Sequence, residues 1–133
     1  NEYVVAVIND DVVAQPGLVP GLADAIIRHG VVASFPDIWG VGRDAVMHQP
    51  SGLRMSGYCF ALRGAANLRA DERLFWWYGD NMLEWEALRA GGVVTVGGLH
   101  IQHLHPSSTT VGELAVQAGK DHDTFVSIWG SAP

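Results

Sequence analysis

Runs of apolar residues divide the chain into segments that predict strands. Residues 3–8 are continuously apolar and β-branched, a pattern typical of a strand covered on both faces in the centre of a parallel sheet. Residues 31–35 predict a second strand. Residues 53–62 predict a third, interrupted at Ser56-Gly57, where a glycine marks a bulge or a close backbone approach. Residues 93–105 predict a long strand, or two strands separated at Gly97-Gly98.

Apolar residues at helical spacing alternate with these strands. A helix is expected after Pro16-Gly17, with its end at Gly30. Residues 80–90 predict a helix that is apolar on most sides and therefore enclosed. Residues 111–129 predict two helical pieces around Gly119. Residues 36–52 are expected to form a loop over a site, and residues 71–78 a short irregular turn rich in aromatic residues. The alternation predicts an α/β fold with a sheet flanked by helices.

Composition limits the possible classes of protein. The chain has 133 residues, of which 48% are hydrophobic and 17% charged, and this predicts one globular domain over residues 1–133. The net charge of −6 offers no basic surface for nucleic acid or an anionic membrane, and no apolar run is long enough for a membrane span. Cys59 is the only cysteine, which favours a reducing, cytoplasmic location and a small buried hydrophobic residue rather than a nucleophile.

Oxygen ligands follow the first predicted strand. In an extended chain Asn9 and Asp11 point to the same side, and Asp10 points away. Two oxygen donors at the carboxyl end of a central strand suit a hard cation such as Mg²⁺ or Mn²⁺. The alternative is ordinary turn chemistry at a strand end, which these three residues taken alone favour.

Asp80 follows Gly79 at the start of a predicted helix. Its ordinary role there is an N-cap, and the functional alternative is a general base that accepts the proton of an attacking hydroxyl. Asp71-Glu72 is a weaker candidate for the same role or for holding an acceptor. Its alternative is a solvated helix start.

Histidines and aromatic residues complete the candidate chemistry. His103 and His105 share one strand face, with His100 on the other, so either can complete a metal shell begun by Asp11. Asp121-His122-Asp123 is interpreted as a helix cap. The aromatic residues Trp76, Trp77, Tyr78 and Trp85 are interpreted as core, with a wall that packs sugar rings as the alternative.

In this order, the segments resemble the family 2 glycosyltransferases of the GT-A fold, in particular the bacterial and phage branch. Residues 7–11 are similar to that family's strand and DxD-type motif, with Asn9 in the first acidic position and Asp11 in the last. Residues 56–62 resemble its strand of small residues facing the acceptor. Asp71-Glu72 followed by residues 78–80 resembles the acidic segment that supplies the catalytic base, with Gly79 in place of a glutamate. His103 with Ser107 and Ser108 resembles its late metal and diphosphate motif, and residues 123–130 resemble its terminal pattern.

The resemblance implies a fold like the C-terminal half of a GT-A enzyme. It implies metal-assisted, inverting transfer of a sugar from a nucleoside diphosphate sugar to an acceptor hydroxyl, with Mn²⁺ or Mg²⁺ as cofactor. Asp80 is then the base, and the metal ligands are Asp11, His103 and His105. The implied diphosphate contacts are Asn9, Asp11 and Ser107, and the implied acceptor contacts are Gly57, Tyr58, Asp71, Glu72, Trp77 and Tyr78.

Two other functions stay open at this point. One is a carbohydrate- or metal-binding module without catalysis, which Gly79 favours. The other is a metal-dependent hydrolase, which ranks last because the chain has no ligand motif of the H-E-x-x-H kind.

The family's nucleotide-binding first half has no counterpart before Asn1, so we expect a fragment, an excised domain or one member of a split pair. An unpaired apolar edge at residues 3–8 then favours a homo-oligomer or a covering partner chain.

Overall fold

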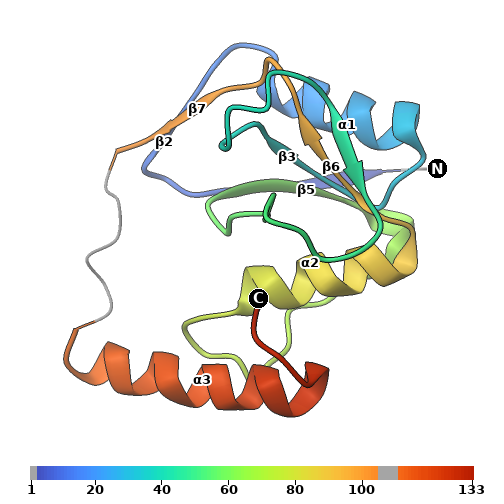
Figure 1. The fold of residues 1–133 in the computed structure, drawn as a ribbon. Helices are drawn as coiled ribbons and strands as arrows, with labels where there is room; N and C mark the ends of the chain where they lie inside the picture. Colours follow the sequence, from blue (N-terminus) through green and yellow to red (C-terminus); the bar gives the residue numbers. More distant parts are fainter. Residues whose placement is uncertain (1–2, 105–110) are drawn as a thin grey trace.

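A mixed sheet lies between helices in the computed structural model, which describes residues 3–104 and 111–133 (Figure 1). The five-stranded sheet has the order β1-β5-β3-β6-β4, and β2 and β7 form a separate antiparallel pair. Only β3 and β6 run parallel; the other neighbours in the large sheet are antiparallel. The elements are β1 (Val4–Ile8), β2 (Val12–Ala14), α1 (Leu18–His29), β3 (Ala33–Pro36), β4 (Ala45–Met47), β5 (Cys59–Arg63), η1 (Gly64–Ala66), α2 (Gly79–Ala90), β6 (Val93–Val96), β7 (Ile101–His103) and α3 (Glu113–Trp129).

The two faces of the sheet support separate apolar clusters. Leu22 and Ile26 of α1 pack with Ala61 of β5 on one face. On the other face, Leu83 and Ala87 of α2 pack with Phe35 of β3. Successive residues of a strand point to opposite faces, so the uninterrupted apolar runs of β3 and β6 are explained by helices on both sides.

Helix α3 lies against α2 on the side away from the sheet (Figure 1). Aromatic residues join the two helices. The ring of Phe125 lies 5.1 Å from that of Trp85, measured between centroids, and Trp129 Nε1 is 2.9 Å from Met82 Sδ. Since α2 contacts the sheet on one side and α3 on the other, the prediction that this helix is enclosed on most sides is confirmed.

The interpretation of residues 3–8 as a central parallel strand is wrong. Within the described part of the chain, β1 is an edge strand that pairs only with β5, in the antiparallel sense. Val5, Val7 and Ile8 are exposed, whereas Val4 and Ala6 pack toward the α1 cluster. An uninterrupted apolar run therefore does not establish burial on both faces here, although the expected apolar edge is present.

Three other boundaries differ from the sequence prediction. Residues 36–52 contain the strand β4, which pairs with β6. Residues 53–58 are not a strand, and β5 begins at Cys59. α3 is one continuous helix through Gly119 rather than two pieces. The helices ending at Gly30 and Gly91 and the two strands on either side of Gly97-Gly98 are confirmed. Among the described residues, no helix is both long and apolar enough to cross a membrane.

Candidate functional site

A broad cavity of about 1160 Å³ lies among the loops at one end of the large sheet. It brings together residues that are far apart along the chain: Asp11 and His103, Asp80, and the backbone around Gly57. Its lining residues are Asn9, Asp11, Ile38, Trp39, Arg54, Met55, Ser56, Gly57, Tyr58, Trp76, Trp77, Tyr78, Gly79, Asp80, Asn81 and His103.

The pairing of β2 with β7 places His103 beside Asp11. Val12 is opposite His103 in the register, and the Leu104 N–H donates to the Asp11 carbonyl at 2.9 Å. His103 Nε2 lies 3.0 Å from Asp11 Oδ2, and the imidazole stacks on the Tyr58 ring with centroids 4.4 Å apart. The acid and the imidazole are therefore fixed in one position by strand pairing and by an aromatic neighbour.

Asn9 and Asp11 line the cavity and Asp10 does not, as the sequence predicts. The reason differs from the predicted one. Residues 10 and 11 form a turn, closed by the Val12 N–H donating to the Asn9 carbonyl at 3.3 Å, rather than an extended strand. The turn keeps both oxygen-bearing side chains on the cavity side.

The donor set at Asp11 fits a divalent cation. Asp11 Oδ1 is buried and has no hydrogen-bond partner among the described residues, which is costly unless another group occupies that position. One or two carboxylates are a common protein contribution to Mg²⁺ or Mn²⁺ when substrate phosphates and water complete the shell. His105 and Ser107 lie outside the described residues. Within residues 3–104 and 111–133, no three His, Cys, Asp or Glu side chains converge as a complete metal site.

Asp80 lies at the cavity surface as the second residue of α2. The N-cap is Tyr78, which has a left-handed backbone with φ of 66° and makes no side-chain capping bond, so the N-cap interpretation of Asp80 is wrong. Asp80 Oδ2 accepts the Gly57 N–H at 2.9 Å and Oδ1 accepts the Asn81 N–H at 2.9 Å. Burial raises the pKa of Asp80 despite these donors, which makes its carboxylate a stronger base.

Gly57 is in close contact with Asp80. A Cβ atom at position 57 would lie 3.3 Å from both Cβ and Oδ2 of Asp80. The absence of a side chain at Gly57 therefore allows its N–H to approach the carboxylate.

The aromatic side of the cavity is held by Asp121. Its carboxylate accepts the N–H groups of Trp76 and Trp77, both at 2.7 Å, and that of Phe75 at 3.2 Å. Asp121 is fully buried within α3, so the interpretation of residues 121–123 as a helix cap is wrong. Burial by itself would raise its pKa, but the donors from Trp77 and Trp76 lower it.

A second buried acid, Asp37, fixes the loop that contributes Ile38 and Trp39 to the cavity surface. Asp37 accepts the N–H groups of Gly42 at 2.7 Å, Val41 at 2.9 Å and Trp39 at 3.3 Å. Burial would raise the pKa of Asp37, and the donors from Gly42 and Val41 lower it. Trp39 Nε1 also donates to the Arg54 carbonyl at 2.8 Å, so its indole crosses to the 54–58 segment.

Asp71 and Glu72 do not line the cavity. Arg73 Nη2 lies 2.6 Å from Asp71 Oδ2, and this hydrogen-bonded pairing lowers the pKa of Asp71 to about 2. Glu72 is exposed. Gly57, Tyr58, Trp77 and Tyr78, by contrast, all contribute to the cavity surface.

Glu84 is a buried acid that the sequence interpretation missed. Its side chain lies one helical turn after Asp80, and its Oε1 accepts the Met55 N–H at 2.8 Å. Burial raises the pKa of Glu84 to about 7. The i, i+4 spacing of Asp80 and Glu84 was the available signal, but the exposure of Glu84 cannot be judged without the position of residues 50–57. Cys59, interpreted as a small buried residue, is buried.

Comparisons with models of known protein families, with curated protein sequences and with solved structures gave no significant match to this chain.

Proposed function

We propose that the chain provides the cation site and the catalytic base of a metal-assisted glycosyltransferase that uses a nucleoside diphosphate sugar and inverts the anomeric carbon. The observation that carries the proposal is that the Asp11–His103 pair and Asp80 line one cavity although they are distant in sequence. An acid and imidazole suited to a cation, and a separate carboxylate of raised pKa, are the two chemical groups that such a reaction needs.

In this proposal Asp11, with Asn9 and His103, holds Mn²⁺ or Mg²⁺ at the donor end of the cavity. Asp11 Oδ1, which has no hydrogen-bond partner within the described part of the chain, supports this role because a cation would compensate its burial. A divalent ion offsets the negative charge that develops on a departing diphosphate. His103 Nε2 lies 3.0 Å from Asp11 Oδ2, and the imidazole stacks on Tyr58 with ring centroids 4.4 Å apart, so the two proposed ligands lie side by side.

Asp80 accepts the proton of the acceptor hydroxyl in the proposed reaction. The N–H groups of Gly57 and Asn81 fix its carboxylate, each through a single hydrogen bond to a different oxygen. Each carboxylate oxygen can accept more than one hydrogen bond, so a second interaction with a hydroxyl is available. The raised pKa of Asp80 supports base catalysis, because a weaker acid has a more basic conjugate form.

The acceptor is proposed to be a sugar or glycan that packs on Trp77 and Tyr78. Both rings belong to the loop that Asp121 holds, and both residues line the cavity next to Asp80. A fixed aromatic surface would orient the sugar ring and align its hydroxyl with the anomeric carbon.

Isothermal titration calorimetry tests this proposal. We expect Mn²⁺ to be required for binding of a nucleoside diphosphate sugar, tested with uridine, guanosine and thymidine donors. Asp11→Asn should weaken this binding at least about tenfold, because it removes a carboxylate ligand. Asp10→Asn is the matched control, since Asp10 is exposed and does not line the cavity. Absence of heat with every donor, in the presence of Mn²⁺, would contradict the proposal.

Asp80→Asn provides the catalytic test. Asparagine keeps the size of the side chain but cannot take up a proton at neutral pH, so we expect turnover to fall by about 10² to 10⁴-fold. Binding of the donor should stay near the wild-type value because Asp80 is assigned to the acceptor. Sugar transfer from the donor found by calorimetry is the assay, and unchanged turnover would remove Asp80 as the base.

A binding module without catalysis is the second candidate. The observation that favours it is that both oxygens of Asp80 already accept backbone N–H groups, which gives this acid a structural role. The same calorimetry separates the two functions. Heat on addition of free sugars or glycans, without any response to nucleotide donors, would favour the module.

A further inference from the structure

Two acids of α2 hold one backbone segment. Asp80 and Glu84 are one helical turn apart, and they accept the N–H groups of Gly57 at 2.9 Å and of Met55 at 2.8 Å. Met55 and Gly57 are alternate residues of the segment that leads into β5. Residues four apart lie on the same face of a helix, so the two carboxylates form a pair of acceptors for these N–H groups.

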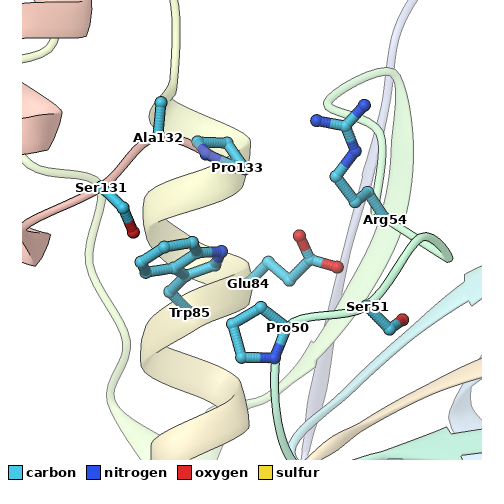
Figure 2. A pocket seen from close by; sticks show the side chains of 8 residues that line it. All are labelled: Pro50, Ser51, Arg54, Glu84, Trp85, Ser131, Ala132 and Pro133. Carbon is cyan, nitrogen blue, oxygen red and sulfur yellow. The ribbon is translucent and has the colours of Figure 1, made fainter.

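The Glu84 carboxylate projects from α2 toward residues 50–54, where it and Arg54 line a pocket of about 310 Å³ (Figure 2). The residue is 3% exposed and its Oε2 has no hydrogen-bond partner among the described residues. A buried carboxyl group with one unsatisfied oxygen is costly to the fold. Since an apolar residue of similar size would avoid this cost, the position of Glu84 is explained best by the bond to Met55.

We propose that Glu84 is a positioning residue for the acceptor side of the cavity: it fixes Met55 and thereby holds Gly57 where its N–H reaches Asp80. The assignment of the acceptor side rests on the proposed function, whereas the contact itself does not. Glu84 is absent from the lining of the large cavity, so it acts on that cavity only through the 55–57 segment and Asp80.

The charged groups that face Glu84 come from two elements. Asp80 on α2 disfavours its ionisation and Arg54 on the adjoining segment favours it, while burial has the larger effect and brings the pKa of Glu84 to about 7. The other residues of the small pocket, Pro50, Ser51, Trp85 and residues 131–133, have no ionisable side chain. A change of the Met55 amide signal near neutral pH therefore reports that Glu84 ionises next to Met55 and hence that the two residues are in contact.

Nuclear magnetic resonance of ¹⁵N-labelled protein tests the proposal without any metal, donor or acceptor. In the wild type, the amide signals of both Met55 and Gly57 should change with pH and share one inflection near pH 7. Glu84→Gln keeps an oxygen that accepts the Met55 N–H but cannot titrate. In this variant both amides should stay protected from hydrogen exchange and the inflection of the Met55 amide should disappear, while the Gly57 amide keeps any change caused by Asp80, to which it is bound.

Glu84→Leu removes the acceptor and keeps the volume. Exchange of the Gly57 amide should become at least about tenfold faster, along with that of Met55, because the segment is released from α2. Asp80→Asn should lower the pH of the inflection, since it removes a neighbouring negative charge.

Two results would overturn the proposal. One is a Gly57 amide that keeps its wild-type exchange rate in folded Glu84→Leu. The other, which applies even if that variant does not fold, is a pH profile of the Met55 amide that is the same in the wild type and in Glu84→Gln. Lack of donor binding by the wild type would instead refute the proposed function and leave the role of Glu84 in holding residues 55–57 intact.

Discussion

Individual carboxylates fix the backbone around the cavity. Asp37 binds N–H groups of residues 39–42 and Asp121 binds those of residues 75–77. Asp80 binds the N–H of Gly57, and Glu84 binds that of Met55. A carboxylate that accepts two or three N–H bonds satisfies donors that a loop otherwise leaves unpaired. The acids of this chain therefore have a structural role in addition to any chemical one.

Asp121→Asn should destabilise the protein by about 3 kcal/mol, because replacing a buried carboxylate by an amide turns an NH₂ group toward backbone donors. Three N–H groups and the Gln117 amide, 2.8 Å from Asp121 Oδ1, would be affected. Urea denaturation measures the free energy of unfolding. Asp123→Asn is the matched control, since the side chain of Asp123 is 87% exposed on the same helix, and a similar loss in both variants would contradict this role of Asp121.

The lowered pKa of Asp121 predicts how the stability of the protein changes with pH. The pKa of Asp121 is lower in the folded protein than its ordinary value of 3.8. Its stabilising contribution is therefore complete above about pH 4 to 5 and is lost as the pH falls toward the folded-state pKa. Urea denaturation between about pH 2 and pH 5 should show a shallower loss of stability for Asp121→Asn than for the wild type. Parallel pH profiles would contradict this expectation.

The sequence indicates some individual residues of the cavity and misses others. Asp11, His103 and Asp80 could be selected because their types and positions beside apolar segments suggest chemistry, and all three line the cavity. Asp121 and Glu84 could not be assigned correctly, because their partners are backbone groups about 45 and 29 positions away in the chain. Such partners leave no signal in the side-chain pattern.

Helices α2 and α3 differ in how much of their surface packs against other elements. α2 is supported by the sheet on one side and by α3 on the other, whereas much of α3 faces solvent along its first half. Gly119 lies in the exposed part of α3, and the helix continues through it. A glycine in the interior of a helix costs free energy relative to alanine because the unfolded chain has more conformational freedom.

Gly119→Ala should therefore stabilise the protein by about 1 kcal/mol. Apart from the adjacent residues and the backbone of the helix itself, no atom of the described residues lies within 4 Å of a Cβ built at this position, so the change causes no clash. Gly130→Ala is the matched control: its Cβ would also meet no atom, but φ is +81°, so we expect a loss of about 1 kcal/mol. Thermal unfolding followed by circular dichroism compares them. A loss of stability in Gly119→Ala would indicate a break in α3 at this residue.

Local sequence patterns located the helices better than the strands. α1 and α2 were predictable because Gly30 and Gly91 mark their ends. β4 was not, because its three residues lie between segments rich in glycine and proline, and the strand exists through pairing with β6. For β1, the apolar residues predicted a strand but not its position in the sheet. An edge strand and a central strand differ in the strands that pair with them, which the local sequence does not contain.

The whole molecule has helices on both sides of a sheet whose two edge strands, β1 and β4, both carry exposed apolar residues, and β1 is the longer of the two. Among residues 3–104 and 111–133, β1 has β5 as its only partner strand, and Val5 and Val7 on it are 45% and 37% exposed. An open strand edge with apolar side chains is a site for pairing with another strand. The proposal of a homo-oligomer or a covering partner chain therefore concerns this edge.

Val5→Lys should reduce self-association, because a charged edge strand opposes pairing with another strand. We expect the wild type to be larger than a monomer in light scattering at high concentration and the variant to be shifted toward the monomer. Val116→Lys introduces the same charge on α3, where Val116 is 62% exposed, and should leave the association unchanged. A monomeric wild type at every concentration would contradict self-association through β1.

Paramagnetic broadening by Mn²⁺ tests most directly the claim that one cavity holds a cation at Asp11 and His103 and faces Asp80. The measurement compares amide signals with Mn²⁺ and with Mg²⁺, each in the presence of uridine or guanosine diphosphate. We expect the greatest broadening at residues 9–11 and 103, smaller broadening at Gly57 and Asp80, and sharp signals at Val116 on the exposed side of α3. Broadening centred on exposed acids such as Asp24 or Asp123, with sharp signals at Asp11 and His103, would contradict it.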